Sequence, residues 1–178
     1  MQTDVLSGHL NNNGLVVNST GRTRLRAISY TGTATAGGFV VWDTLTAPVA
    51  ATYGRSGTTV TITSASHGLS TGQAVGIDFA SASGSSATDG NYIITVTDTN
   101  TFTVTDVNSG TIATSTACNY VVATADNSTT WLTAVDTAGI QPTYFALPGE
   151  GLLVHKGIYL SLTNMTGRSE EHTSELQS

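Results

Sequence analysis

The sequence is poor in charged residues, proline and aromatic side chains. Its net charge is negative. Charged residues make up 10% of the 178 residues, aromatic residues make up 7%, and there are three prolines. Disordered chains are typically rich in charge and proline, so this composition indicates a chain that folds. Nonspecific nucleic-acid binding needs a basic surface. With a formal net charge of −6, the chain is not expected to bind nucleic acid.

Cysteine and long apolar segments are equally scarce. Cys118 is the single cysteine, so it has no disulfide partner within the chain, and no cluster of cysteine and histidine around it indicates a metal site. No run of about 18 apolar residues is long enough to span a membrane. Residues 1–4 lack the basic start and apolar run of a signal peptide. We therefore expect no membrane association and no bound cofactor.

The sequence is instead rich in threonine, serine, asparagine and glycine, arranged as short alternating segments between turns. Val or Ile alternates with Thr in several of these segments, which is the period of a half-buried β-strand. No segment has both the period of about 3.6 residues and the length of a helix. The strands predicted in this way include 58–63, 74–79, 92–97, 101–105 and 119–123. Many short strands between Gly-rich turns predict an all-β fold of the sandwich or barrel type.

Two hairpins are predicted where short polar turns join neighbouring strands. Residues 92–97 and 101–105 flank the sequence Asp-Thr-Asn at 98–100. Residues 152–155 and 158–162 flank a Lys-Gly turn near the end of the chain.

A change of composition near residue 53, reversed after about residue 124, indicates one β unit inserted into a loop of another. Residues 1–52 and 124–167 are predicted to form an outer β-sandwich or jelly-roll-like domain. Residues 53–123 are predicted to form a small inserted module, either a β-barrel or an Ig-like fold. Such insertions are tolerated where the ends of a surface loop lie close together.

Residues 168–178 resemble, at every position, the in-frame translation of a short-read sequencing adapter. This resemblance implies that the gene was read from an environmental or draft assembly and that the natural C-terminus is missing. The alternative is a natural polar tail. We therefore expect residues 168–178 to be an artefact, and we assign no acid–base role to Glu170 or His172.

Residues 67–75, 89–96 and 99–104 combine His-Gly-Leu and Asp-Gly turns with alternating strands. This pattern resembles a small β fold of bacteriophage structural proteins, known by its likeness to the first catalytic-cysteine half-domain of ubiquitin-activating enzymes. The resemblance implies a spacer or interaction module. It implies no ubiquitin chemistry, because Cys118 matches no catalytic cysteine.

The outer segments carry Arg-Thr-Arg-Leu at 22–25, Pro-Gly-Glu-Gly-Leu-Leu at 148–153 and a closing strand at 158–163. They resemble a group of small virion structural proteins of marine phages. The resemblance implies location in the virion, as a capsid decoration or tail-associated protein, contacts with other virion proteins and a homo-oligomer. A further strand usually follows in that group. Because the adapter-like residues stand in its place, we expect the outer sheet to end in an unpaired edge.

Arg22, Arg24 and Arg26 fall on one face of a predicted strand, because they alternate with smaller or apolar residues. They are three of the five basic residues that precede the adapter-like segment. Two interpretations stay open. The arginines protect a solvent-facing or edge strand by their charge, or they dock onto an acidic neighbouring subunit.

His67 is interpreted as a structural residue, because it lies on a turn where a histidine side chain bonds the local backbone. The alternative is a catalytic base beside Asp78 or Asp89. Asp98 and Asn100 likewise fit turn chemistry. The Gly-x-Ser-x-Gly pattern occurs once, at residues 68–72, but on a predicted turn between two strands and not between a strand and a helix as in a nucleophile elbow.

A calcium site formed by Asp98, Asn100 and Asp106 is the weaker alternative for these acidic and amide side chains. Calcium loops place their oxygen ligands at close and regular spacing on one loop. Here a predicted strand separates Asp106 from the other two residues. The sequence therefore predicts no metal site.

Two functions remain for a chain with these patterns, and a third is disfavoured. The first is a phage virion structural protein. The second is an adhesin that binds host-surface glycans, for which Trp42, Trp131, Tyr144 and Tyr159 offer a stacking platform, although packing in the core is the favoured role of these side chains. An enzyme such as a glycan hydrolase needs paired carboxylates. Since Glu150 is the only glutamate before residue 168, we expect no enzymatic activity.

Overall fold

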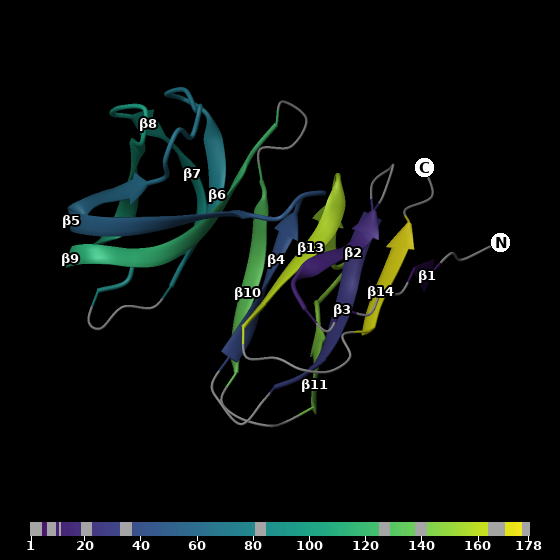
Figure 1. Cartoon of the computed structure of the whole chain (residues 1–178). Coiled ribbons are helices and arrows are strands. Elements are labelled where there is room, and N and C mark those ends of the chain that lie inside the picture. The colour runs from purple at the N-terminus through teal and green to yellow at the C-terminus, as the bar shows by residue number, and fades with distance from the viewer. Residues whose placement is uncertain are drawn as a thin grey trace. The chain divides into compact units, whose positions relative to one another are not determined.

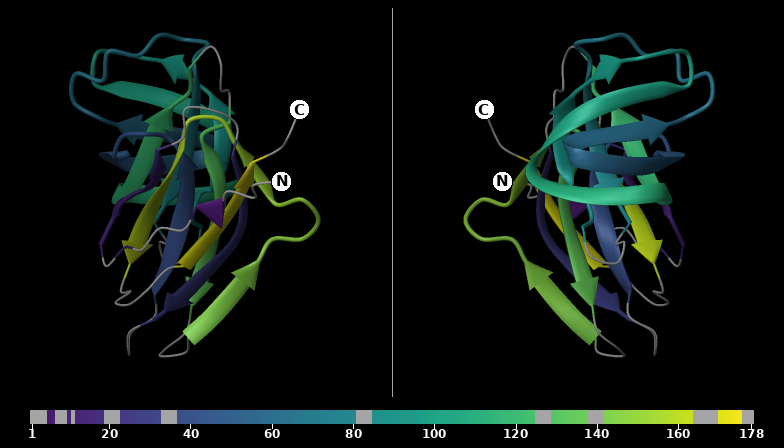
Figure 2. Two further views of the ribbon diagram at one scale, coloured as in Figure 1. Left: turned by 90° about the vertical axis from the view of Figure 1, so that its right-hand side faces the viewer. Right: turned by 90° about the vertical axis from the view of Figure 1, so that its left-hand side faces the viewer.

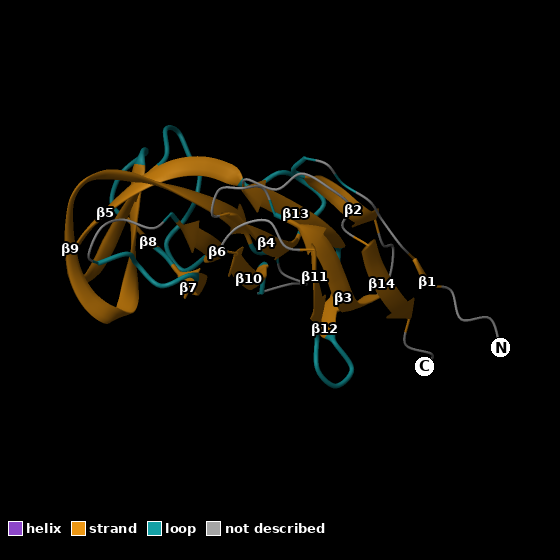
Figure 3. Cartoon of the chain, turned by 90° about the horizontal axis from the view of Figure 1, so that it is seen from below, coloured by secondary structure: helices purple, strands orange, loops and turns teal. Residues whose placement is uncertain are grey.

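The fold is all-β, as the sequence predicts. The structure is a computed structural model that describes residues 5–6, 10, 12–18, 23–32, 37–80, 85–124, 129–137, 142–163 and 170–175. These residues form fourteen β-strands and no helix, and the strands are drawn in orange in Figure 3. In the same part of the chain, no helix is long and apolar enough to cross a membrane.

The chain divides into two compact units, and each is described by itself below. Unit 1 combines residues 1–47 with 132–178, and unit 2 comprises residues 48–131. The sequence placed the boundaries of the inserted module at 53 and 123, and both positions lie inside unit 2.

Unit 1 contains two antiparallel sheets (Figure 1). In the first sheet, the strands run in the order β1 (Val5–Leu6), β14 (Glu170–Glu175), β3 (Thr23–Thr31) and β11 (Pro142–Ala146), and β12 (Leu152–Val154) also pairs with β3. In the second sheet, the order is β10 (Trp131–Thr137), β4 (Gly37–Asp43), β13 (Gly157–Thr163) and β2 (Gly14–Asn18).

The core of unit 1 is built from both sheets, which makes the unit a β-sandwich. Leu25 and Ile28 of β3 belong to the same buried cluster as Phe39 of β4 and Leu160 of β13. Along β3, buried and half-buried positions alternate from residue 23 to 27, as the sequence predicts for a strand with one face toward a core. Tyr30 meets Phe39 edge to face, with ring centroids 5.1 Å apart.

The predicted C-terminal hairpin is wrong. The two strands exist, but β12 pairs with β3 in the first sheet, whereas β13 pairs with β4 and β2 in the second. The turn between them is therefore a crossing from one sheet to the other. The carboxylate of Asp43, which is 1% exposed, accepts hydrogen bonds at this turn. Its donors are the backbone N–H groups of His155, Lys156 and Gly157, at 2.7 Å, 2.8 Å and 3.2 Å.

The expected unpaired edge of the outer sheet is also not observed. The backbone of β14, which lies within the adapter-like segment, pairs antiparallel with β3 from Thr23 to Ser29 and with the short β1. Strand pairing is made by backbone groups that every residue except proline carries. This pairing therefore does not test the proposed origin of residues 168–178.

Unit 2 is one strongly curled antiparallel sheet rather than a sandwich. Its strands run in the order β5 (Val49–Thr63), β9 (Thr101–Val122), β6 (Ala74–Phe79) and β7 (Gly90–Ile93), and β8 (Thr95–Val96) also pairs with β9. The long strands β5 and β9 form the two curved ribbons of Figure 1, and Figure 2 shows their curvature from both sides. The predicted strands 101–105 and 119–123 are the two ends of the single strand β9, which ends at Val122.

The curl follows from an unequal number of residues in the two long strands. Gly57 pairs with Gly110 and Thr59 pairs with Thr105, so residues 106–109 of β9 form a bulge opposite Thr58. A second shift in register occurs between Tyr53 and Arg55 of β5. Bulges bend the strand that carries them and increase its twist. The concave side encloses the core of unit 2, which includes Tyr53, Val60, Ile62, Val75, Ile77, Phe79, Ile94, Phe102, Val104, Cys118 and Tyr120.

Unit 2 extends beyond the predicted module because both of its ends bond to the sheet. At the start, Val49 of β5 pairs with Tyr120 of β9. At the end, the Asn91 carboxamide accepts the N–H groups of Thr130 and Trp131, at 2.9 Å and 3.1 Å, and donates to the Trp131 carbonyl. The Thr130 hydroxyl, in a residue that is 2% exposed, donates to the Val121 carbonyl.

A fragment of residues 48–131 is therefore expected to fold, whereas a fragment of residues 53–123 is expected to be less stable. The shorter fragment loses the pairing of residues 49–52 with β9 and the bonds of Asn91 to residues 130 and 131. At about 1 kcal/mol for each hydrogen bond, we expect a loss of at least about 2 kcal/mol, or roughly 10 °C in Tm. Thermal unfolding followed by circular dichroism measures the difference. Equal Tm values for the two fragments would contradict the boundaries at 48 and 131.

Candidate functional site

The arginine face of β3 is partly engaged by the same chain. Arg22 lies outside the described residues. Arg24 and Arg26 lie on the half-buried face of β3, opposite the core, as the alternation predicts. Arg24 donates to the carbonyl of Gly151 at 3.5 Å, and Arg26 donates to the carbonyl of Gly149 at 3.0 Å. Both side chains therefore hold the turn at 148–151.

Glu150 at the tip of this turn forms an ion pair with Arg24. The guanidinium nitrogen and carboxylate oxygen are 3.3 Å apart, and the two side chains are 19% and 68% exposed. Ion pairs that are this exposed to solvent contribute at most about 1 kcal/mol to the free energy of unfolding. Docking of the arginine face onto a neighbouring subunit stays a prediction. A subunit that docks there also has to fit around the turn at 148–151, which Arg24 and Arg26 already bind.

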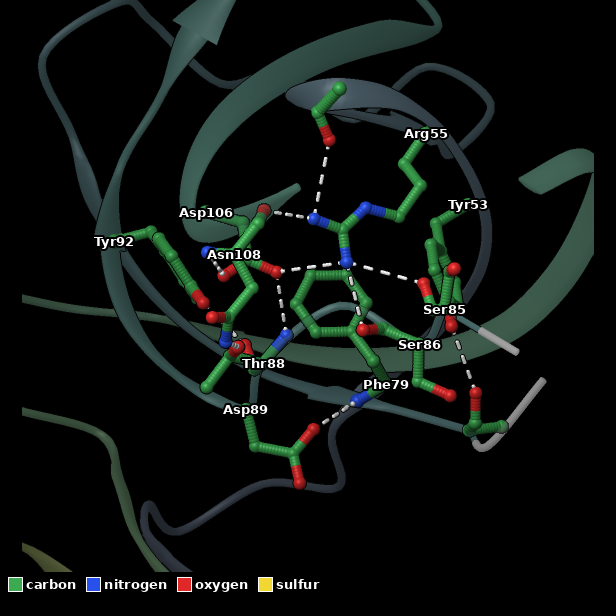
Figure 4. Close-up of polar contacts among 12 residues, drawn as sticks. Tyr53, Arg55, Phe79, Ser85, Ser86, Thr88, Asp89, Tyr92, Asp106 and Asn108 are labelled. Atoms are coloured by element: carbon green, nitrogen blue, oxygen red, sulfur yellow. Dashed lines mark hydrogen bonds and ion pairs between the residues drawn. The ribbon is translucent and has the colours of Figure 1, made fainter. Parts of the chain in front are cut away.

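The most elaborate polar site is a buried ion pair in unit 2, between Arg55 of β5 and Asp106 of β9 (Figure 4). The guanidinium nitrogen and carboxylate oxygen are 3.3 Å apart, and the two side chains are 1% and 0% exposed. Two charges removed from water are costly unless their remaining hydrogen-bonding groups are satisfied. The surroundings of both groups show how this cost is met.

Backbone carbonyl groups accept nearly all the protons of the Arg55 guanidinium. One terminal nitrogen donates to the carbonyl groups of Ser85 and Ser86, at 3.2 Å and 2.8 Å. The other donates to the carbonyl groups of Gly57, at 3.2 Å, and Asn108. Only the Nε proton has no partner among the described residues. Arg55 thus ties the loop after β6 to the bulge of β9.

Two backbone N–H groups also donate to the Asp106 carboxylate. Thr88 donates at 2.8 Å and Asn108 donates at 3.0 Å. Burial alone raises the pKa of Asp106, but these hydrogen bonds, together with the Arg55 guanidinium, outweigh burial and hold the pKa below its ordinary value. The carboxylate therefore stays ionised at neutral pH.

Two tyrosines and an aspartate complete the attachment of the loop. The Tyr53 hydroxyl donates to the Ala80 carbonyl at 2.9 Å, and the Tyr92 hydroxyl donates to the Thr88 carbonyl. Asp89 accepts the N–H group of Phe79 at 2.8 Å. Burial, followed by the nearby carboxylates of Asp106 and Asp89, raises the pKa of Tyr92 to about 12, so it stays protonated as a donor.

The bulge and a glycine make room for this cluster. An added Cβ atom at Gly110 would lie 2.6 Å from the Ser85 Cβ and 3.3 Å from the Arg55 guanidinium carbon. Only glycine lets these groups approach so closely. The same bulge leaves Val107 86% exposed, which is the most exposed large apolar side chain of the described residues.

The sequence does not predict this ion pair. Arg55 is counted there only among the basic residues and Asp106 is considered only as a calcium ligand, whereas the carboxylate binds Arg55 and backbone N–H groups. A signal was present, because Arg55 lies two residues after Tyr53 on the same face of a strand. A charged residue at a core-facing position needs a partner of opposite charge.

The turn residues behave as the sequence predicts. The Nδ1 atom of His67 accepts the Leu69 N–H at 3.0 Å, and Nε2 lies 3.1 Å from the Asp98 carbonyl oxygen. These contacts require the neutral tautomer with its proton on Nε2. The Asp98 carboxylate accepts the Asn100 N–H and the Thr101 hydroxyl, at 2.7 Å and 2.6 Å. The local-backbone role of His67 and the turn role of Asp98 are therefore confirmed.

The four aromatic residues considered as a sugar platform do not share one environment. Trp42 is 0% exposed and donates to the Ser161 hydroxyl at 3.0 Å, so its predicted place in the core is confirmed. Tyr144 is 63% exposed, so a core position is wrong for this residue. Trp131 and Tyr159 are half-buried. A stacking platform that includes Trp42 is excluded, because no face of its indole ring reaches solvent.

The polar groups of unit 2 are arranged to fasten backbone segments rather than to converge on a reacting atom. Arg55, Asp106 and Asp89 are bound to main-chain groups, and so is His67. Among the described residues, no group of three or more His, Cys, Asp or Glu side chains is placed to hold a metal ion. No family model, curated protein sequence or solved structure matches the chain.

Breaking the buried ion pair is expected to destabilise unit 2 strongly. Asp106→Asn leaves the Arg55 charge buried without its counter-ion, which costs about 3 kcal/mol or more in unfolding free energy. Glu150→Gln is the matched control at the exposed pair with Arg24, where we expect a loss of less than about 1 kcal/mol. Urea denaturation measures both losses of unfolding free energy. Equal losses would contradict the claim that the buried pair of Arg55 and Asp106 stabilises the fold more than the exposed pair.

The same variant is expected to change the acid sensitivity of the protein. Because the folded-state pKa of Asp106 is lowered, its stabilisation is complete above the unfolded value of about 3.9 and is lost as the pH falls below it. As the pH falls below about 4, the urea midpoint of the wild type should therefore fall more steeply than that of Asp106→Asn. Asp98, whose pKa is lowered chiefly by the Thr101 hydroxyl, contributes equally to both proteins. Parallel pH profiles would argue against an ionised, stabilising Asp106.

Cys118 is expected to be unreactive in the folded protein. Its side chain is buried in the core of unit 2, and burial, followed by the Asp78 carboxylate, raises its pKa to about 12. Since the thiolate is the reactive form, labelling by a disulfide reagent near pH 8 should be on the order of a thousandfold slower than for an exposed thiol. Urea-unfolded protein is the positive control. Rapid labelling of the folded protein would place Cys118 outside the core.

Proposed function

We propose that this protein is a non-catalytic structural component of a bacteriophage virion, acting by protein–protein contacts as a capsid decoration or tail-associated protein. The observation that carries the proposal is the use of its charged side chains. In both units the described arginines and several carboxylates bind backbone groups of the same chain. They serve to fix turns, bulges and sheet crossings.

The composition of the outward-facing strands supports this role. Because the chain has few charged residues, its exposed surfaces consist largely of threonine, serine and asparagine, as along the outer faces of β5 and β9. These uncharged faces add little to the repulsion that the net charge of −6 produces between copies. A protein that is packed at high copy number against its neighbours benefits from strand faces of this kind. The implied partners are other virion proteins, including further copies of this chain.

The glycan-binding alternative has less support. The enclosure of Trp42 removes one of the two tryptophan rings from the proposed stacking platform. Of the other three rings, Trp131 and Tyr159 are half-buried and only Tyr144 is exposed. This is a weak basis for carbohydrate recognition, because sugar-stacking sites depend on exposed aromatic faces. The structural role is therefore favoured over the adhesin role.

Mass spectrometry of purified phage particles tests the proposal. Trypsin cleaves after Arg26 and Arg55, so residues 27–55 form a diagnostic peptide far from the adapter-like segment. We expect this peptide to copurify with infectious particles through a density gradient, at a constant ratio to the major capsid protein. A host cytoplasmic protein, measured in the same fractions, controls for contamination. Detection in the lysate but not in the particles would contradict the virion role.

A further inference from the structure

We propose that unit 2 joins a second copy of this chain through antiparallel pairing of the two β5 strands at their open edges. By open edge we mean the side of β5 that does not face β9. The proposal rests on the structural function proposed above and names the partner and the surface. The predicted dimer is centred on Thr61 of both copies.

The open edge is long for a strand at the end of a sheet. β5 covers residues 49–63 and, among the described strands, pairs with β9 alone. Proteins normally protect such edges with charge, proline or a covering segment. The stretch Thr58–Thr63 contains neither charge nor proline, and its residues are threonine, valine and isoleucine. This part of β5 is therefore well suited to accept another strand.

The partner that fits this edge can be inferred from the strand that already occupies the opposite edge. Residues 101–105 of β9 follow the pattern Thr-x-Thr-x-Thr with large apolar residues between the threonines. Residues 59–63 of β5 follow the same pattern. A second copy of β5 therefore presents to the open edge nearly the same side chains as β9 presents to the paired edge.

The existing register also predicts the register of the dimer. Thr61 of β5 lies opposite Thr103 of β9, and the flanking pairs are Thr59 with Thr105 and Thr63 with Thr101. With two β5 strands centred on Thr61, this residue faces its own equivalent, and Thr59 of each copy faces Thr63 of the other. Threonine then meets threonine on the outer face, and Val60 meets Ile62 on the core side. A shift by one residue would reverse these faces.

The symmetry and size of the contact predict its strength. Antiparallel pairing of one segment with itself is isologous and closes after two copies. Five paired residues are far fewer than the roughly 20–30 residues on each side of a standard interface. We therefore expect a weak, concentration-dependent dimer in solution, which becomes populated where many copies are held close together on a particle.

Single-cysteine variants of the full chain test the register. Cys118 is buried and its pKa is about 12, so only an introduced thiol should react. In the proposed dimer, Thr61→Cys places two equivalent thiols on directly opposed residues, whose Cβ atoms lie about 5 Å apart. Mild oxidation should convert it to a covalent dimer. Thr59→Cys and Thr103→Cys, on the same face but not opposite their own equivalents, are the controls and should crosslink at least about tenfold more slowly.

Lysine variants test the same edge without a covalent bond. Sedimentation of the wild type from micromolar to millimolar concentration should show a monomer–dimer equilibrium. Thr61→Lys opposes two like charges and should weaken dimerisation about tenfold or more. Thr103→Lys adds the same charge to the neighbouring strand and should change the association constant less than about threefold.

Three results would overturn the proposal: a monomer at every concentration, crosslinking of Thr103→Cys as fast as Thr61→Cys, or faster crosslinking of Thr59→Cys. The second result would indicate face-to-face stacking, and the third a different register. These measurements use purified protein. A dimer without particle association would therefore refute only the virion role, and particle association without a dimer would refute only the edge pairing.

Discussion

The pairing of β5 with β9 is the interaction on which the rest of unit 2 depends. The two strands remain paired from Val49 opposite Tyr120 to Thr63 opposite Thr101, although β9 carries more residues over this distance. The surplus is absorbed in bulges, which curl the ribbon. The curl brings β8 and β6 onto the other edge of β9, at its two ends, and so encloses a core.

The buried ion pair is a consequence of that curl. The largest bulge begins at Asp106. The backbone of Arg55 lies opposite Ile112, beyond the bulge, and its buried side chain reaches Asp106 from β5. Neither charge would remain buried without the backbone groups of the loop at 85–88 and of the bulge itself. Buried pairs of this kind add little net stability compared with a well-packed apolar core, but they strongly disfavour arrangements that leave one charge unpaired. In this protein the pair fixes the loop and the bulge in one arrangement.

Unit 1 shows the same use of polar groups at a different place in the fold. The Asp43 carboxylate holds the crossing between β12 and β13, and Arg24 and Arg26 hold the turn that precedes β12. A protein with so few charged residues thus uses many of them to bind its own backbone. This use of charge is the ground on which we propose a structural role.

The sequence by itself determined the all-β class, the inward and outward faces of β3, and the turn roles of His67 and Asp98. These properties depend on alternation and on neighbours a few residues away, which the sequence displays directly. Only the tertiary structure decided that β12 and β13 lie in different sheets, that β9 is a single strand, and that Arg55 meets Asp106. These outcomes depend on pairing between distant segments. Every residue except proline carries the same backbone hydrogen-bonding groups, so these groups do not depend on the sequence. Alternation can therefore predict a strand and its faces but not which strand pairs beside it.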